Sequence, residues 1–257
     1  MSRILAKSGP YGRHHRLLLR RFEMRDALVT NAGHALPGIE VVKAELIKRY
    51  ENEEFEVDLA LFDFVGMRWW VALVLAQVDD FDIDVLIPTH ALRRTGFLTE
   101  DAEALASRAP NGRDADVRSL VLNQVPELVV FVSRPEPGWF DRIMGSEGHL
   151  AVLETFSNLG GDSLLRINGD LPHATGTRIT ECTQIPGAPR LLKLPGQAPA
   201  WPQEPAVIEY EGETLRATTT IAGNDVLLSL DSHIESGKGY SLWRLADRYF
   251  ELRWEEA

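Results

Sequence analysis

The stretch EFEVDLALFDFVGMRWWVALVLAQVDDFDIDVLIP, from Glu54 to Pro88, decides the fold class that we predict for this chain. Its two apolar runs, Phe55 to Val65 and Trp69 to Val78, have the length of strands and are joined by a short turn that contains Gly66. Both runs are almost continuously apolar, which is typical of strands that are covered on both faces. We therefore expect an antiparallel hairpin inside a layered fold.

Segments on either side of this hairpin have helical periodicity. Residues 13–30 carry apolar side chains at helical spacing, and Gly38 to Tyr50 shows an apolar stripe of the same kind. Thr99 to Arg108 and Asp114 to Gln124 are further helix candidates, and Glu127 to Ser133 is a strand of the buried type. A hairpin set between helices favours an α/β fold, with a mixed sheet that helices flank on both faces.

The character of the sequence changes near Thr175. Six prolines lie between Pro186 and Pro205, which indicates an extended linker or an irregular edge. Residues 206–254 alternate between apolar and polar side chains, which predicts a small antiparallel β domain of four or five strands. The predicted parts are a basic N-terminal arm and helix at 1–37, an α/β nuclease-like domain at 38–174, a Pro-rich linker at 175–205 and a small C-terminal β domain at 206–257.

The composition is that of a globular protein. Of the 257 residues, 44% are hydrophobic, which is enough for a core. No apolar run approaches the roughly 18 residues that span a bilayer, so we expect no membrane segment. One cysteine, Cys182, excludes an intrachain disulfide framework, and we expect a cytoplasmic protein.

The charge is unevenly distributed. The net charge is −11, yet the first fifty residues hold ten Lys or Arg against four Asp or Glu. This asymmetry predicts that the N-terminal segment meets an acidic partner, either nucleic acid or another protein, through Arg13, Arg16, Arg20 and Arg21. A helix with a solvated basic face is the alternative. The acidic balance of the whole chain argues against strong, sequence-independent DNA binding.

The order helix, strand hairpin, helix, strand over residues 38–133 resembles the core of the PD-(D/E)XK nuclease-like superfamily. That family places a glutamate on its first helix, an aspartate on the next strand, and an acidic residue two positions before a lysine on the following strand. Its carboxylates bind Mg²⁺ on one side of the sheet, and the lysine positions or activates the attacking water.

The resemblance implies roles for individual residues of this chain. Glu40 or Glu45 matches the helix glutamate, and Asp58, or less well Asp63, matches the strand aspartate. Leu75 and Gln77 fall where the acidic residue and the lysine belong, and leucine cannot bind a metal. The resemblance therefore implies a degenerate site with no resident cofactor, and Mg²⁺ only if the site is active. Structural roles for Glu40 and Asp58, at a helix start and a strand end, remain open.

A run of aspartates follows the second apolar strand. In an extended segment Asp80, Asp82 and Asp84 project from one face, and oxygen ligands so close together suit Mg²⁺ or Ca²⁺. An active site with migrated ligands would use one of Asp79 to Asp84 beside Asp58, and Asp79 and Asp80 are the candidate metal ligands. A solvated strand exit explains the same run without a metal.

Three functions remain open at this point. The resemblance implies a catalytically degenerate protein that acts as a binding or scaffolding subunit of a nucleic-acid-processing or phage-defence assembly. An active metal nuclease whose carboxylate ligands have migrated is the second hypothesis. A protein-interaction module with no nucleic-acid role is the third.

Overall fold

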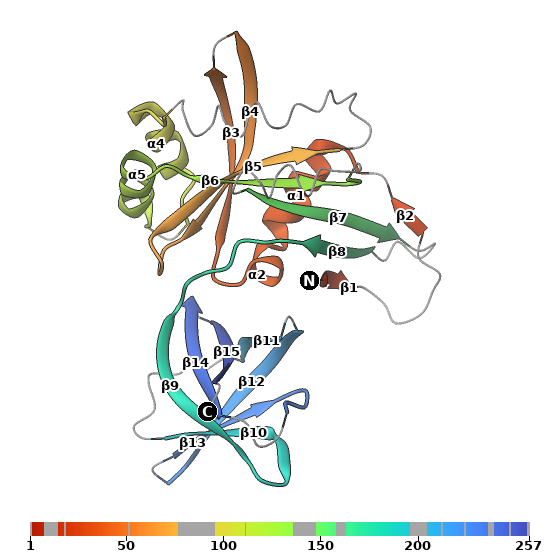
Figure 1. Cartoon of the computed structure of the whole chain (residues 1–257), viewed down its shortest axis with the longest axis vertical. Coiled ribbons are helices and arrows are strands. Elements are labelled where there is room, and N and C mark those ends of the chain that lie inside the picture. The colour runs from red at the N-terminus through yellow and green to blue at the C-terminus, as the bar shows by residue number, and fades with distance from the viewer. Residues whose placement is uncertain are drawn as a thin grey trace. The chain divides into compact units, whose positions relative to one another are not determined.

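The computed structural model describes residues 2–7, 15–17, 19–50, 52–76, 96–110, 112–135, 148–157, 163–195, 205–211, 213–223, 225–235, 239–246 and 248–255. The chain divides into two compact units, Met1–His173 and Ala174–Ala257. Each unit has its own sheet and its own hydrophobic core (Figure 1).

The first unit is built on one mixed sheet. Its strands are β1 (Ser2–Lys7), β2 (His15–Leu17), β3 (Glu40–Tyr50), β4 (Glu53–Asp63), β5 (Arg68–Leu75), β6 (Glu127–Val132), β7 (His149–Ser157) and β8 (Ser163–Gly169). Its helices are α1 (Arg21–Thr30), α2 (Ala32–Ala35), α4 (Thr99–Ala106) and α5 (Asp114–Asn123). The sheet order is β1-β8-β7-β6-β5-β4-β3, with β2 paired to β7. Only the pairs β5–β6 and β6–β7 are parallel.

The core of this unit lies over β5 and β6, which are buried along all but their first residues. Leu105 of α4 and Leu120 of α5 pack into one apolar cluster with Val71 and Val130 of the two strands. Helix α1 packs against β3 and β5 and buries Met24 and Leu28. Strands that lie in the middle of a sheet and beneath helices must be apolar on both faces, which explains the sequence of β5.

The predicted fold class is wrong. The chain is mostly β-structure, and the nuclease-like sheet flanked by helices that we expected is not its architecture. The main error is the segment that we predicted as the first helix, because residues 40–50 form strand β3. From Ala44 to Arg49 buried and exposed residues alternate one by one, which is the period of a strand and not of a helix.

The prediction of a separate N-terminal arm and helix at 1–37 is also corrected. Strand β1 pairs with β8, and β2 pairs with β7, so the N-terminal segment extends the sheet. The helix begins at Arg21 and not near residue 13. Pairing partners that lie more than a hundred residues away leave no local signal in the sequence.

The second unit is a closed barrel of seven strands, β9 (Thr177–Ile185), β10 (Ala188–Leu194), β11 (Ala206–Tyr210), β12 (Glu213–Ala222), β13 (Asp225–Leu230), β14 (Gly239–Ala246) and β15 (Tyr249–Glu255). Its order is β10-β13-β12-β11-β15-β14-β9. The pair β11–β15 is parallel, and all the others are antiparallel. Ile208, Leu228 and Tyr240 are among the side chains that fill the interior.

The prediction of a Pro-rich linker at 175–205 is wrong for most of that segment, because it contains β9 and β10. Ile185 and Ala188 are opposite each other across a two-residue turn made by Pro186 and Gly187. Gly187 has a φ of 78°, which suits the third position of a type II turn after a proline. Pro186 therefore marks a turn of the barrel, and Pro189 lies near the start of β10.

Candidate functional site around Asp58

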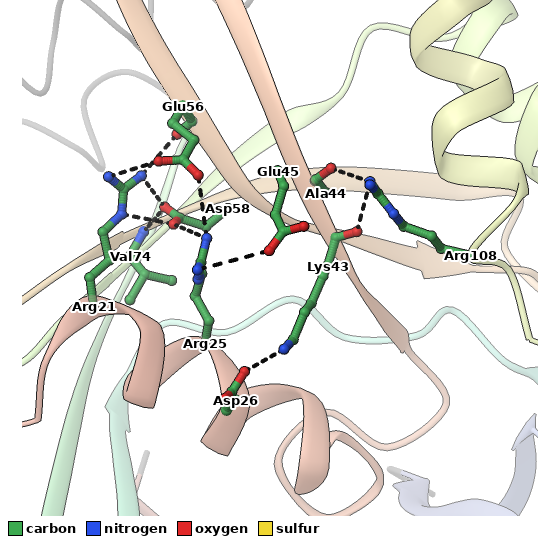
Figure 2. A network of polar contacts seen from close by, with 10 residues as sticks. All are labelled: Arg21, Arg25, Asp26, Lys43, Ala44, Glu45, Glu56, Asp58, Val74 and Arg108. Carbon is green, nitrogen blue, oxygen red and sulfur yellow. Dashed lines mark hydrogen bonds and ion pairs between the residues drawn. The ribbon is translucent and has the colours of Figure 1, made fainter.

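Asp58 is fully buried and ionically paired. Its carboxylate forms a two-pronged contact with Arg21 of α1, in which Nε donates to Oδ1 and Nη2 donates to Oδ2, each at 2.8 Å. The backbone N–H of Val74 donates to Oδ2, also at 2.8 Å. Figure 2 shows this group of contacts between α1, β4 and β5.

The local backbone explains why a carboxylate is needed at this position. The ladder between β4 and β5 runs from the turn back to the pair Leu59–Ala72, so Asp58, the residue preceding Leu59, has no partner in it. The Asp58 side chain then accepts the hydrogen bond that Val74 offers beyond the end of this ladder. A buried N–H without an acceptor costs free energy, so the carboxylate serves as a substitute strand partner.

Strand β3 has a bulge opposite the same residue. Lys43 is opposite Leu59 and Leu46 is opposite Val57, so Ala44 and Glu45 together oppose Asp58. Glu45 has a φ of 49°, in the left-handed region that residues other than glycine seldom adopt. The bulge turns the β3 backbone, and it directs the Glu45 side chain toward α1 (Figure 2).

A second arginine joins the network. Arg25 Nη1 lies 3.6 Å from Asp58 Oδ1 and 3.3 Å from Glu56 Oε1, and Arg25 Nη2 lies 3.9 Å from Glu45 Oε1. Arg21 Nη1 lies 3.2 Å from Glu56 Oε2. Two guanidinium groups thus meet three carboxylates, so the fully ionised cluster carries one net negative charge.

The bulge is also held from its other side. The guanidinium of Arg108, which follows α4, donates through Nη1 to the carbonyl oxygens of Ala44 and Lys43. The Lys43 side chain reaches Asp26 of α1 at 2.5 Å. The irregular backbone at Ala44 and Glu45 is therefore fixed by residues from two different helical segments (Figure 2).

Burial and charge act in opposite directions on Asp58. Burial raises the pKa of the Asp58 carboxyl above its ordinary value, and the Arg21 guanidinium and the Val74 N–H offset only part of that effect. Each carboxylate oxygen already accepts from Arg21, and Oδ2 accepts from Val74 as well. A metal ion would have to displace these donors to reach the oxygens.

The other residues that we predicted for this site are dispersed. Glu40 is exposed and opposite Phe62, which is four strand residues, or roughly 13 Å, along β4 from Asp58. Leu75 belongs to the cluster that α4 and α5 cover, and it is opposite Val132 of β6. Of the predicted carboxylates, the structure brings Glu45 near Asp58, with Arg25 between them.

Several predicted residues lie outside the described part of the chain: Arg13, Gln77, Asp79 and Asp80. Arg16 belongs to β2, opposite Phe156. Arg20 is exposed at the residue before α1, and Arg21 is the partner of Asp58. The predicted basic group is therefore not one exposed surface, because Arg21 points inward to Asp58.

Two residues of the network were missed from the sequence, Arg25 and Glu56. Arg21 and Arg25 are four apart, which places them on one side of a helix, and Glu56 and Asp58 are two apart, which is the spacing of one strand face. Matching a pair of arginines at helical spacing to a pair of acids at strand spacing would have identified the network.

A second polar network lies at the start of the parallel strands. Trp70 Nε1 donates to Glu127 Oε2 at 3.0 Å, and Glu127 Oε2 lies 3.4 Å from His149 Nε2. His149 Nδ1 in turn lies 2.6 Å from Asp170 Oδ2. These contacts join β5, β6, β7 and the residue after β8, so they fix the ends of four neighbouring strands.

Within the residues that the structure describes, no three His, Cys, Asp or Glu side chains gather to hold a metal ion. In the same residues no helix is long and apolar enough to cross a membrane. Comparisons of the chain with protein-family models, with curated proteins and with solved structures found no match. The resemblance to the PD-(D/E)XK superfamily therefore stays a prediction.

Proposed function

We propose that this protein is a non-catalytic scaffolding subunit that binds a protein partner. The observation that carries the proposal is the saturation of the Asp58 carboxylate by Arg21, Arg25 and the Val74 N–H. A buried carboxylate that holds two guanidinium groups serves to dock α1 on the sheet. Removing the Asp58 carboxylate lowers the stability of the fold, because it leaves buried charge without a partner.

The charge of the surface supports a protein partner over nucleic acid. Arg21 and Arg25 are consumed in ion pairs inside the first unit, so they add little to a basic surface. The residues after position 50 are strongly acidic, and phosphates are repelled by such a charge. Arg20 is an exposed basic residue at the start of α1, and the nucleic-acid test below therefore includes it.

Exposed apolar side chains offer a contact surface. Met67 in the β4–β5 turn is 41% exposed, and Val125 before β6 is 69% exposed. Gln124 Nε2 donates to the Met67 carbonyl oxygen at 2.8 Å, which holds these two connections side by side. Apolar side chains gathered on a surface are the kind of contact that a protein partner covers.

The setting of this function is also part of the proposal. The resemblance alone supports an assembly that processes nucleic acid or acts in phage defence. The single cysteine, Cys182, supports a cytoplasmic location, because one thiol allows no intrachain disulfide.

The partner test uses the full chain with a purification tag in its own host. The double variant with Met67→Glu and Val125→Glu is compared with Ile221→Glu, a matched control at an apolar residue of β12 that is 78% exposed. We expect a specific protein to co-purify with the unmodified chain and with the control. The amount recovered with the double variant should be lower by about tenfold or more. Equal recovery with all three chains would contradict the proposed surface.

The catalytic test uses the purified chain with Mg²⁺ or Mn²⁺ and labelled DNA or RNA at low salt. We expect no cleavage and no gel shift. Cleavage that Asp58→Asn abolishes would overturn the non-catalytic proposal. A gel shift that is lost in Arg20→Glu would show that the partner is nucleic acid and not a protein.

A further inference from the structure

Strand β3 ends the sheet of the first unit, and in the described residues no strand pairs with its outer edge. An edge of this kind offers unpaired backbone N–H and C=O groups to another chain. Ile47 lies near the C-terminal end of β3. Its side chain is 68% exposed, which is unusual for an isoleucine on a strand. The edge and its exposed isoleucine are therefore a candidate contact surface.

The bulge limits how much of this edge is open. Arg108 occupies the carbonyl oxygens of Lys43 and Ala44, and the left-handed backbone of Glu45 breaks the regular strand. After the bulge, residues 46–50 continue as regular strand paired with β4 on the inner side. The open edge is thus a short segment that starts at Leu46.

The side chains of this segment, together with the adjoining Glu45, alternate between two faces. Leu46 and Lys48 are buried, and Lys48 Nζ lies 2.7 Å from Asp101 Oδ2 on α4. Glu45, Ile47 and Arg49 face the other side and are exposed by 45%, 68% and 78%. The bulge residue Glu45 and the open segment that follows it therefore present an acidic, an apolar and a basic side chain in turn on one face.

This order is self-complementary. We propose that two copies of the chain pair through the outer edges of β3, antiparallel and centred on Ile47. Across a two-fold axis at that residue, Ile47 meets Ile47 of the other copy, while each Glu45 meets an Arg49. Directly opposed side chains of an antiparallel pair approach to about 4.5–5.5 Å between Cβ atoms, close enough for an ion pair and an apolar contact.

Other arrangements are less favourable. Parallel pairing in register places Glu45 against Glu45 and Arg49 against Arg49, which is repulsive. An antiparallel pair centred on Leu46 places Arg49 against Lys43, and one centred on Lys48 leaves Ile47 opposite Arg49. Only the arrangement centred on Ile47 matches charge with charge and apolar with apolar.

The open edge of β4 is a poorer site. Its pairing with β5 stops at Leu59, but the preceding segment carries Glu53, Glu54 and Glu56. Self-pairing of that edge gathers like charges. The basic side chain on which the proposed pairing depends, Arg49, belongs to β3. Arg49 also contacts Glu54 of β4 across the hairpin.

The test measures self-association of the full chain by analytical ultracentrifugation over a range of concentrations. We expect a monomer–dimer equilibrium that Ile47→Lys abolishes. Glu45→Arg or Arg49→Glu alone should each weaken the dimer about tenfold, because each opposes like charges. The double exchange Glu45→Arg with Arg49→Glu should restore it, since opposite charges then meet again. Thermal unfolding of each variant checks that the chain remains folded.

A cross-linking measurement tests the register. Ile47→Cys should form an intermolecular disulfide under mild oxidation, because the two copies of residue 47 are opposed at the axis. Ile221→Cys, at a more exposed apolar position, is the control and should cross-link more slowly. A monomer at every concentration, or a double exchange no tighter than the single variants, would overturn the proposal. This inference is independent of the proposed protein partner, because purified chain alone is used.

Discussion

Asp58 shows how one buried charge organises its surroundings. It has no exposed surface, and burial raises the pKa of its carboxyl, so the ionised form needs compensation from the protein. Arg21 and Arg25 provide it from α1, while Val74 provides a backbone donor from β5. The arginines are in turn fixed by Asp58, which makes the carboxylate a joint between helix and sheet.

Replacing Asp58 by Asn tests this structural role. The amide keeps the shape but leaves two partly buried guanidinium groups without their shared carboxylate. We expect a loss of about 2–3 kcal/mol in the free energy of unfolding, somewhat below the cost of breaking a fully buried pair. Glu56→Gln, at a half-exposed partner of the same arginines, should cost less than about 1 kcal/mol. Urea denaturation measures both. A larger loss for Glu56→Gln would argue against Asp58 as the joint.

Removing Arg21 should make stability depend on pH. In Arg21→Met the strongest compensation is gone, so the folded-state pKa of Asp58 rises further above its unfolded value. A carboxyl with a raised folded pKa contributes stability that is fully present below the unfolded pKa and lost as pH rises through the folded pKa. The variant should therefore be destabilised more at pH 7 than at pH 4 relative to the unmodified chain. Unfolding curves at the two pH values measure the difference, and an equal loss at both would contradict it.

The β3–β4 hairpin is fixed to α4 by a second buried ion pair. Lys48 and Asp101 have side chains that are only 8% and 14% exposed, and the Lys48 ammonium also lies 4.7 Å from the centre of the Phe97 ring. Asp101 accepts in addition from the Leu98 N–H, at the beginning of the helix. Asp101 thus both caps α4 and anchors the strand that carries the bulge.

Removing Asp101 and removing Lys48 should lower the free energy of unfolding by different amounts. Asp101→Ala leaves a buried ammonium without a partner and an open N–H at the helix start. Lys48→Met leaves a carboxylate that the helix dipole and Leu98 still stabilise. We expect Asp101→Ala to lower the free energy of unfolding by about 3 kcal/mol, and Lys48→Met by about half of that. Urea denaturation of the two variants gives the order, and the reverse order would refute this account of Asp101.

The sequence pattern predicted some elements of this unit and not others. The hairpin of β4 and β5, the helices α4 and α5, and strand β6 are confirmed, because long apolar or strongly periodic runs encode them locally. Strand β3 was missed because Val42, Leu46 and Ile47 are apolar at helical spacing, although Ile47 is exposed and does not belong to the buried face of the strand. Asp58 was singled out correctly, but its partner Arg21 lies 37 residues away in the sequence. Pairing at such a distance is a property of the tertiary fold.

Considered as a whole, the molecule joins a sheet that has edges to a barrel that has none. The barrel closes through a parallel contact between β11 and β15, which sequence alternation alone does not reveal. Its first two strands lie in the proline-rich part of the sequence, where Pro186 and Gly187 form the turn signal that separates them. A closed sheet pairs all its strands internally, so the barrel has no open strand edge for another chain to pair with. The open strand edges belong to the sheet of the first unit.

Closure also predicts that the barrel folds without the rest of the chain. Residues 174–257 form a compact unit with its own core, in which Ile208, Leu228 and Tyr240 are fully enclosed. Expressed alone, this fragment should give a strand-type circular dichroism spectrum and one cooperative thermal transition, because its pairing and burial are complete within the fragment. The full chain should then show a matching transition, and Ile208→Ala should shift that transition and leave the one of the first unit unchanged. Such a substitution in a packed core costs about 2–5 kcal/mol, enough to move the midpoint by several degrees. A fragment that stays unfolded, or a substitution that moves every transition together, would mean that the barrel draws its stability from the first unit.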